Sequence, residues 1–226
     1  MADLIITIDG PAASGKSTVA RLLAERIGAS FLDTGAMYRA VTLAAMQAGV
    51  DMSNEEELLD VLAANKFEFA VKKGETAVFI NGVDFTEQIR DPEVTASARY
   101  VASAAGMREK LVQMQRQFAA NEKRIVTEGR DQGTVAFPDA DVKFYLTAEM
   151  SERTRRRQAE LREQGREADF AQIQRDIEKR DESDRSRATG PMKPAEGGII
   201  VDTTKLSIEE VVEKLLGYVE KKCLKR

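Results

Sequence analysis

Residues 10 to 17 have the types and the spacing of a loop that binds phosphate groups. They read Gly10-Pro11-Ala12-Ala13-Ser14-Gly15-Lys16-Ser17 and fit the pattern G-x-x-x-x-G-K-[ST]. In such a loop, backbone N–H groups converge on phosphate oxygens, and glycine is required where a β-carbon would clash or where φ is positive. Lys16 is then expected to reach the outer phosphates and the Ser17 hydroxyl to ligate Mg²⁺. The pattern predicts a site for a nucleoside triphosphate.

The segments on either side of this loop are those that a phosphate-binding loop requires. Residues 4–8 form a short apolar run rich in isoleucine, which is typical of a buried parallel strand. After the loop, apolar residues recur at helical spacing from Val19 to Ile27, and Gly28 is a helix-ending residue. The N-terminus of that helix, with its partial positive charge, would point at the bound anion.

A second group of polar residues follows the next predicted strand, at residues 30–32. A helix is expected from about residue 36 to residue 48, ending at Gly49. Because open α/β sheets bind ligands at the carboxyl ends of their strands, this loop is placed for a phosphate acceptor. Taken alone, Arg39 would be interpreted as a solvated helix residue. The candidates here are Asp33, Thr34, Tyr38 and Arg39.

The segment from residue 51 to residue 120 is predicted to be an insertion with its own short strands. Ser53 and Glu56 have the spacing of a capping box at a helix start. Alternating apolar residues from Phe67 to Ile80, with the turn dipeptides Lys73-Gly74 and Asn81-Gly82, then predict antiparallel strands. A further helix should begin after Asp91, with Pro92 in its first position, and run to about residue 120 with a bend at Gly106.

The residues after the third predicted strand, 124–128, carry a second Arg-Asp pair. Arg130 and Asp131 lie between Gly129 and Gly133, before a fourth strand at 142–146. A charged pair in this position is expected to face the ligand crevice, and the alternative is an ordinary surface turn.

Two charged helices, separated by Gly165, are predicted between residues 151 and 190. This stretch has 11 basic and 10 acidic side chains. An apolar stripe on the second helix, which starts after Asp169, continues at the same spacing as Arg180, Asp184 and Arg187. We expect one helix face to begin in the core and to end in an anion-binding cleft. The arginines of the first helix are placed as a lid over the triphosphate.

Composition excludes several classes of site. The chain of 226 residues has no histidine, which rules out Ser-His-Asp catalysis and the commonest zinc sites. Its single cysteine, Cys223, excludes a disulfide framework and fits a reducing, cytoplasmic compartment. A net charge of −4 argues against nucleic acid as the partner, and no long apolar stretch or signal peptide is recognised. A monomer is the default expectation.

A fifth strand at 199–202 and a final helix after the capping box of Ser207 and Glu210 complete the pattern. We therefore predict an α/β fold, in which a five-stranded parallel sheet carries helices on both faces, with a small antiparallel β insertion and a helical lid. The core would comprise 1–50, 121–149 and 188–226, the acceptor-binding insertion about 51–120, and the lid about 150–187.

Four motifs, in order and spacing, resemble the bacterial cytidylate kinases. They are GPAASGKS, LDTGAMYR at 32–39, EGRDQGTVAFPDA at 128–140 and RDESDRSRA at 180–188. The resemblance covers nearly the whole chain and implies a P-loop nucleoside-monophosphate kinase fold. It also implies transfer of a phosphoryl group from ATP to CMP or dCMP, with Mg²⁺. Such a reaction needs no general base, because the acceptor phosphate is already ionised near neutral pH.

The resemblance also assigns roles by matching position. It implies that the acceptor phosphate is contacted by Thr34, Arg39, Arg130 and Arg187. The pyrimidine would lie against Tyr38, and its polar edge would be recognised by Arg108 and Asp131. The ribose would be held by Arg180 and Asp184. It implies that Lys16, Arg130, Arg153, Arg157 and Arg187 stabilise charge during transfer. ATP is assigned to 10–17 with Thr18 and Arg156, and Mg²⁺ to Ser17, with Asp33 as a further candidate ligand.

Two questions stay open at this point. The family commonly has a serine that contacts cytosine where this chain has Arg99, so either Ser97 or Ser103 takes that role or base recognition is looser. The alternative functions are a kinase for UMP or another small acceptor, with Asp33 or Asp131 as base for a hydroxyl group, and a P-loop switch protein. Asn65-Lys66-Phe67-Glu68 lacks the final aspartate of a guanine-specific element and lies too early in the chain.

Overall fold

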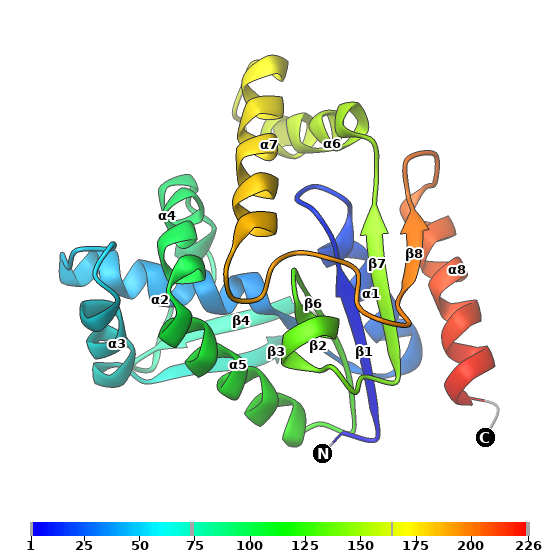
Figure 1. The fold of residues 1–226 in the computed structure, drawn as a ribbon, viewed down its shortest axis with the longest axis horizontal. Helices are drawn as coiled ribbons and strands as arrows, with labels where there is room; N and C mark the ends of the chain where they lie inside the picture. The colour runs from blue at the N-terminus through cyan, green and yellow to red at the C-terminus, as the bar shows by residue number, and fades with distance from the viewer. Residues whose placement is uncertain (1, 73–74, 164, 225–226) are drawn as a thin grey trace.

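The core of the protein is a five-stranded parallel sheet. It is seen in a computed structural model that describes residues 2–72, 75–163 and 165–224. The strands lie in the order β2-β6-β1-β7-β8, and every neighbouring pair is parallel (Figure 1). Their bounds are β1 Leu4–Asp9, β2 Ser30–Asp33, β6 Arg124–Gly129, β7 Val142–Thr147 and β8 Ile199–Asp202. The predicted α/β fold with five parallel strands is confirmed.

Helices cover both faces of this sheet, because its central strands are apolar on both sides. The helices α1 (Lys16–Ile27) and α8 (Ile208–Val219) pack on one face, around Ile6, Ile8 and Val126. On the other face, Leu32 and Ile125 pack against a second group of helices. That group comprises α2 Thr34–Ala48, α3 Glu55–Ala64, α4 Pro92–Ser103 and α5 Ala105–Ala120.

The predicted β insertion is a three-stranded antiparallel sheet of β3 (Phe67–Lys72), β4 (Glu75–Ile80) and β5 (Val83–Asp84). It lies beside the β2 edge of the core sheet, where the backbone N–H of Asp33 donates to Thr76 Oγ1 at 3.1 Å. A short 3-10 turn, Gln88–Arg90, connects it to α4. The turn predicted at Lys73-Gly74 lies outside the described residues.

Local signals located most helix ends, with two errors. Gly28 and Gly49 end α1 and α2 with φ of 62° and 67°, as predicted. The predicted N-cap at Ser53 is wrong, because Ser53 Oγ donates to Asp51 and the Asn54 side chain accepts from the first turn of α3 instead. The predicted bend at Gly106 is also wrong: the helix is interrupted at Ala104, whose extended backbone separates α4 from α5.

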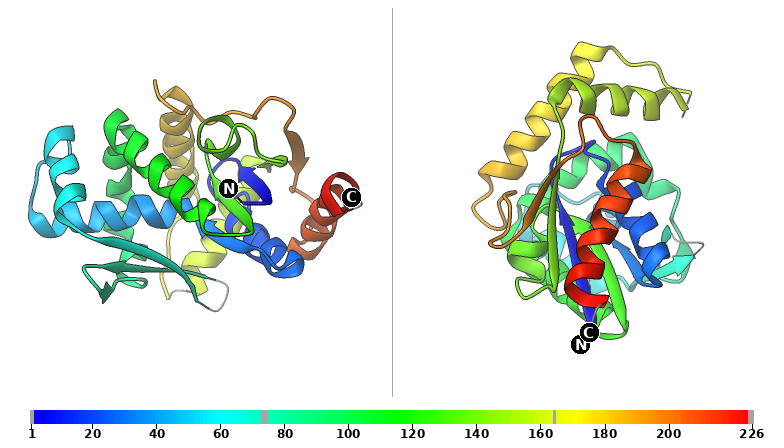
Figure 2. Two further views of the ribbon diagram at one scale, coloured as in Figure 1. Left: turned by 90° about the horizontal axis from the view of Figure 1, so that it is seen from below. Right: turned by 90° about the vertical axis from the view of Figure 1, so that its right-hand side faces the viewer.

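Two charged helices, α6 (Met150–Glu163) and α7 (Phe170–Ser186), lie beyond the carboxyl ends of the core strands (Figures 1 and 2). Asp169 caps α7 by accepting from the N–H of Gln172 at 2.9 Å, as predicted. Short π-helical turns at Gln132–Ala136 and Glu220–Leu224 follow β6 and α8. Across the described residues, no helix combines the length and the apolar character that a membrane crossing requires.

Candidate functional site

The phosphate loop connects β1 to α1 and holds its lysine inside the protein. Gly10 and Gly15 have φ of 148° and 87°, and a β-carbon on Gly10 would collide with the carbonyl oxygen of Leu146. Lys16 is only 5% exposed, and its Nζ donates to the Pro11 carbonyl at 2.6 Å and to Ser14 Oγ at 3.4 Å. Burial, together with the nearby charge of Arg130, lowers the pKa of Lys16 to about 7.

A carboxyl pair lies directly beside the serine of this loop. Ser17 Oγ donates to Glu128 Oε1 at 2.9 Å, and Glu128 is adjacent to Asp33 across the β2–β6 edge. Burial and the charge of Asp33 raise the pKa of Glu128. Burial opposes ionisation of Asp33 too, but Arg39 and the N–H of Ala36 hold its pKa below the usual value. Of the two carboxyl groups, Asp33 is therefore the one that ionises more readily.

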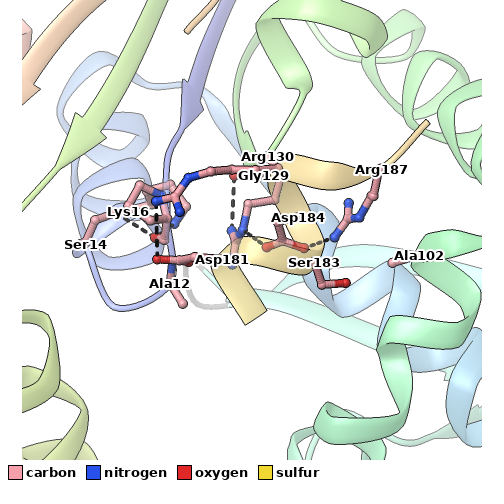
Figure 3. Close-up of polar contacts among 12 residues, drawn as sticks. Ala12, Ser14, Lys16, Ala102, Gly129, Arg130, Asp181, Ser183, Asp184 and Arg187 are labelled. Carbon is pink, nitrogen blue, oxygen red and sulfur yellow. Dashed lines mark hydrogen bonds and ion pairs between the residues drawn. The ribbon is translucent and has the colours of Figure 1, made fainter. Parts of the chain in front are cut away.

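Three arginines on different elements converge on the space beside the phosphate loop, each held by a carboxylate. Arg39 Nη2 bonds Asp33 Oδ2 at 3.0 Å. Arg130 Nε bonds Asp184 Oδ2 at 2.7 Å, and Arg187 bonds the other oxygen of Asp184. Asp184, itself 4% exposed, therefore lies between two arginines (Figure 3). The structure brings these predicted acceptor residues together.

The arginine cluster is crowded enough for its members to disturb one another. Burial and the charges of Arg108 and Arg130 lower the pKa of Arg187 to about 10. Burial of the guanidinium and the charges of Arg130 and Arg39 lower the pKa of Arg180 to about 9. Arg180 as a whole residue is nevertheless exposed to solvent. Because a pKa of about 9 lies well above neutral pH, its guanidinium remains charged there. Gathering these cations without a bound anion costs free energy, which a bound phosphate would recover.

A second buried ion pair, Arg108 with Asp131, lies near Arg187. Arg108 and Asp131 are 2% and 4% exposed and bond to each other, and the Arg108 guanidinium lies 5.7 Å from the ring centroid of Tyr38. Gly190 packs directly on this pair with φ of 63°, and a β-carbon there would collide with both charged groups. The predicted base-reading residues are therefore neighbours.

The predicted residue Thr34 has a different partner in this structure: its Oγ1 donates to the Glu128 carbonyl at 2.7 Å. Thr18 is exposed, directly after the loop, at the start of α1.

The three predicted lid arginines have different surroundings. Arg156 lies over the phosphate loop and donates to the Thr203 carbonyl at 2.6 Å and to Thr203 Oγ1 at 3.0 Å. Arg157 is partly exposed and pairs with Glu160 at 2.9 Å. Arg153, in contrast, is only 4% exposed and its guanidinium bonds Asp181 and the carbonyl of Ala12. This structure therefore places the Arg153 side chain inside the protein, away from solvent.

Arg99 does not leave a buried charge without a partner. The residue is exposed, and its guanidinium lies over the ring of Tyr100, 4.8 Å from the centroid, with Nη2 3.2 Å from the phenol oxygen. The hydroxyl of Ser103 donates to the Arg99 carbonyl at 2.7 Å, whereas Ser97 is partly buried.

Sequence reasoning missed three buried carboxyl groups at the site: Asp9, Glu128 and Asp181. Asp9 accepts from the N–H groups of Gln132 and Gly133, each at 2.8 Å, and so ties the Arg130-Asp131 loop to the strand that precedes Gly10. Burial raises the pKa of Asp9 to about 7. The position of Asp9 and Glu128 at the carboxyl ends of neighbouring strands was the available signal. For Asp181, only its place beside Arg180 gave a hint.

The donor set fits Mg²⁺ only in part. Among the residues that the structure describes, no group of three or more acidic, histidine or cysteine side chains is arranged to hold a metal. The Ser17 hydroxyl, which donates to Glu128, and the neighbouring carboxyl group of Asp33 nevertheless offer hard oxygen atoms of the kind that would suit Mg²⁺ if substrate phosphates completed its coordination.

Comparisons with known proteins give the family of the chain. The sequence profile of the family described as Cytidylate kinase matches residues 6–221. A cytidylate kinase of Rhodococcus opacus is 43% identical over 94% of this chain and 93% of the relative, and one of Shouchella clausii is 46% identical over 95% of both chains. An uncharacterized protein of known structure from Eubacterium ventriosum, 14% identical, shares the fold with a TM-score of 0.55 over 97% of this chain and 99% of its own. The resemblance seen in the sequence is therefore confirmed, and the chain belongs to the cytidylate kinase family.

Proposed function

We propose that this protein transfers the γ-phosphoryl group of ATP to CMP and dCMP, giving ADP and the corresponding diphosphate. The observation that carries the proposal is the convergence of Arg39, Arg130 and Arg187 on the space beside Lys16. Membership of the cytidylate kinase family supports the same reaction. Two separate anion sites, one at the phosphate loop and one at the three arginines, are what a donor triphosphate and an acceptor monophosphate require.

The electrostatics of Lys16 support the idea that the two anion sites adjoin. After burial, the charge of Arg130 is the largest cause of the lowered pKa of Lys16. The two cations therefore lie within reach of one transferring group. We propose that Lys16, Arg130, Arg157 and Arg187 stabilise charge on that group during transfer. The chain has no histidine, and an ionised acceptor phosphate makes a general base unnecessary.

The donor nucleotide is proposed to bind along residues 10–17 and Thr18, with Arg156 above the loop. Ser17, supported by Glu128 and Asp33, would hold Mg²⁺. When bound, this ion neutralises charge on the phosphates and orients them. Arg156 already contacts both Thr203 and the phosphate loop, which suits a residue at the nucleoside end of ATP.

The acceptor base is proposed to lie on Tyr38 and to meet Arg108 and Asp131, which offer donors and an acceptor to its polar edge. We propose that Thr34 and Arg39 contact the acceptor phosphate, and that Arg180 and Asp184 hold the sugar. Because Asp184 already bonds Arg130 and Arg187, it would also set the position of the two phosphate-binding arginines.

A coupled assay of ADP release with Mg-ATP tests the proposal when run with CMP, dCMP, UMP, AMP and GMP and with no acceptor. Release that depends strongly on CMP and dCMP is expected. Comparable rates with UMP would keep the kinase but change the proposed base selectivity. The absence of stimulation by every monophosphate would refute the assignment.

A cytoplasmic, monomeric state is also proposed. The single cysteine suits a reducing compartment, and small-molecule substrates need no second subunit. Light scattering of the purified protein would show a mass near 25.0 kDa, whereas twice that mass would contradict the proposed monomer.

A further inference from the structure

A buried contact joins the phosphate loop to both lid helices. Asp181 on α7 is fully buried, and Arg153 on α6 is 4% exposed. One carboxylate oxygen of Asp181 accepts from the N–H of Ala12 at 3.0 Å, and the other accepts from Arg153 Nη1 at 2.5 Å. The same Nη1 donates to the Ala12 carbonyl at 3.0 Å. Both backbone polar groups of one phosphate-loop residue are thus held by this ion pair.

The surroundings of the contact exclude water. Ala12 packs in a small apolar cluster with Leu161 of α6 and with Ile173 and Ile177 of α7, all less than 9% exposed. Electrostatic interactions are stronger in such a place than in water, and a charge left without its partner is correspondingly costly. The carboxylate of Asp181 therefore fixes its neighbours in one arrangement.

One end of this contact lies in the proposed donor site, and the other lies close to the proposed acceptor site. Ala12 lies between Gly10 and Lys16 in the loop proposed to hold the donor. Asp181 follows Arg180 directly and lies three residues before Asp184, which bonds the acceptor arginines. Helix α7 joins Asp181 rigidly to Asp184. A shift of Asp181 relative to Ala12 would therefore move the acceptor site relative to the donor site.

We infer that Arg153 and Asp181 are positioning residues, which set the alignment of the phosphate loop with α7. On this view neither side chain contacts a substrate. The inference rests on the proposed reaction and changes the role that the family resemblance implied for Arg153, which was charge stabilisation in the lid. It adds to that reaction a structural connection between donor and acceptor sites.

The alternative, in which Arg153 reaches the transferring phosphate, requires several bonds to break at once. Besides its bonds to Asp181 and Ala12, Arg153 donates from Nε to the Ala148 carbonyl at 3.1 Å. Its departure would leave the buried Asp181 carboxylate with only the exposed Arg185, at 4.0 Å, as an ion-pair partner among the described residues. Loss of a close counter-ion is among the more costly changes in a protein interior. Positioning explains the contacts without that cost.

The test compares Arg153→Met, Asp181→Asn and the double variant with wild type. Arg155→Met is the matched control, since Arg155 lies on the same helix with its side chain 69% exposed and pairs with Glu152 at the surface. The turnover number is measured with saturating Mg-ATP and CMP, and the dissociation constant of each nucleotide is measured separately. Thermal unfolding of each variant selects an assay temperature at which every variant is folded.

Each single variant is expected to lower kcat at least tenfold, because small misplacements of reacting groups are costly, while each dissociation constant changes less than about threefold. The double variant should lose about as much as one single variant, because the pair acts as a unit. The Arg155 variant should match wild type. A normal kcat for Asp181→Asn beside a low one for Arg153→Met would show direct action by Arg153 and overturn the inference. A normal kcat in both single variants would mean that the pair does not position the reacting groups, and would also overturn the inference.

Hydrogen exchange gives a second readout that does not depend on turnover. Asp181→Ala removes the acceptor of the Ala12 N–H, so exchange at this amide should accelerate at least tenfold. Unchanged exchange would mean that the pair does not hold the loop. Failure of the wild-type protein to phosphorylate CMP would refute the proposed function instead, and would leave the exchange result to decide whether the contact holds the loop.

Discussion

Binding of ATP should take up a proton through Lys16. In the nucleotide-free protein, burial and the charges of Arg130 and Arg180 hold the pKa of Lys16 at about 7, even though Glu128 and Asp181 oppose that shift. At pH 8 only about one molecule in ten would then carry the charged lysine. The bound triphosphate restores the pKa toward its ordinary value, because opposite charge favours the protonated form.

The expected uptake through Lys16 follows from these values. At pH 8 it is about 0.9 proton per ATP, and at pH 6, where Lys16 is already charged, it is about 0.1. Since the bound state holds the additional proton, ATP affinity should fall by up to about tenfold per pH unit above pH 7. Other buried groups, such as Asp9 with a pKa of about 7, can add their own share.

Isothermal titration of Mg-ATP in two buffers of different ionisation enthalpy measures this uptake without an acceptor. Lys16→Arg is the control, because arginine stays protonated at both pH values. The difference between wild type and this variant isolates the contribution of Lys16. Equal proton uptake by both proteins at pH 8 would refute the reasoning.

Three further changes give distinct expectations. Gly190→Ala should raise the KM for CMP at least tenfold with little change in ATP binding, since its β-carbon displaces Arg108 and Asp131; equal effects on both nucleotides in separate titrations would contradict this. Asp184→Asn should lower the free energy of unfolding by about 2 kcal/mol and weaken CMP use, because two arginines lose the charge of a shared, buried hydrogen-bond partner; an unchanged urea midpoint would count against it. Arg99→Ala should change the ratio of CMP to UMP rates less than about threefold, since Arg99 is exposed against Tyr100; a larger change in competition assays would place Arg99 at the base.

The parts of the fold that could be predicted are those specified by neighbouring residues. The glycines at 28 and 49, the Asp169 cap and the five apolar strands each depend on local conformation or a short apolar pattern. The errors lie where two local solutions compete. Ser53 and Asn54 can both cap α3, and the nearby Asp51 decided between them by bonding Ser53. The helix is interrupted at Ala104, two residues before the glycine that predicted a bend, and no glycine or proline stands at the interruption itself.

The structure brings predicted residues close together where they follow parallel strands, as Asp33, Arg39 and Arg130 do. Their pairing with one another could not be predicted, because it depends on contacts between residues far apart in sequence. Arg153 and Arg156 look alike in the sequence, and only the fold separates the buried one from the one above the phosphate loop. The carboxyl partners Glu128 and Asp181 were missed for the same reason.

The central claim is that the cluster of Arg39, Arg130 and Arg187 serves an acceptor that is itself a phosphate. The most direct test is to compare CMP with cytidine as acceptor, using Mg-ATP and separating the products by chromatography. We expect CDP and ADP in equal amounts from CMP, and no CMP formed from cytidine. Phosphorylation of cytidine at a rate comparable to that of CMP, or ADP release without CDP, would contradict it.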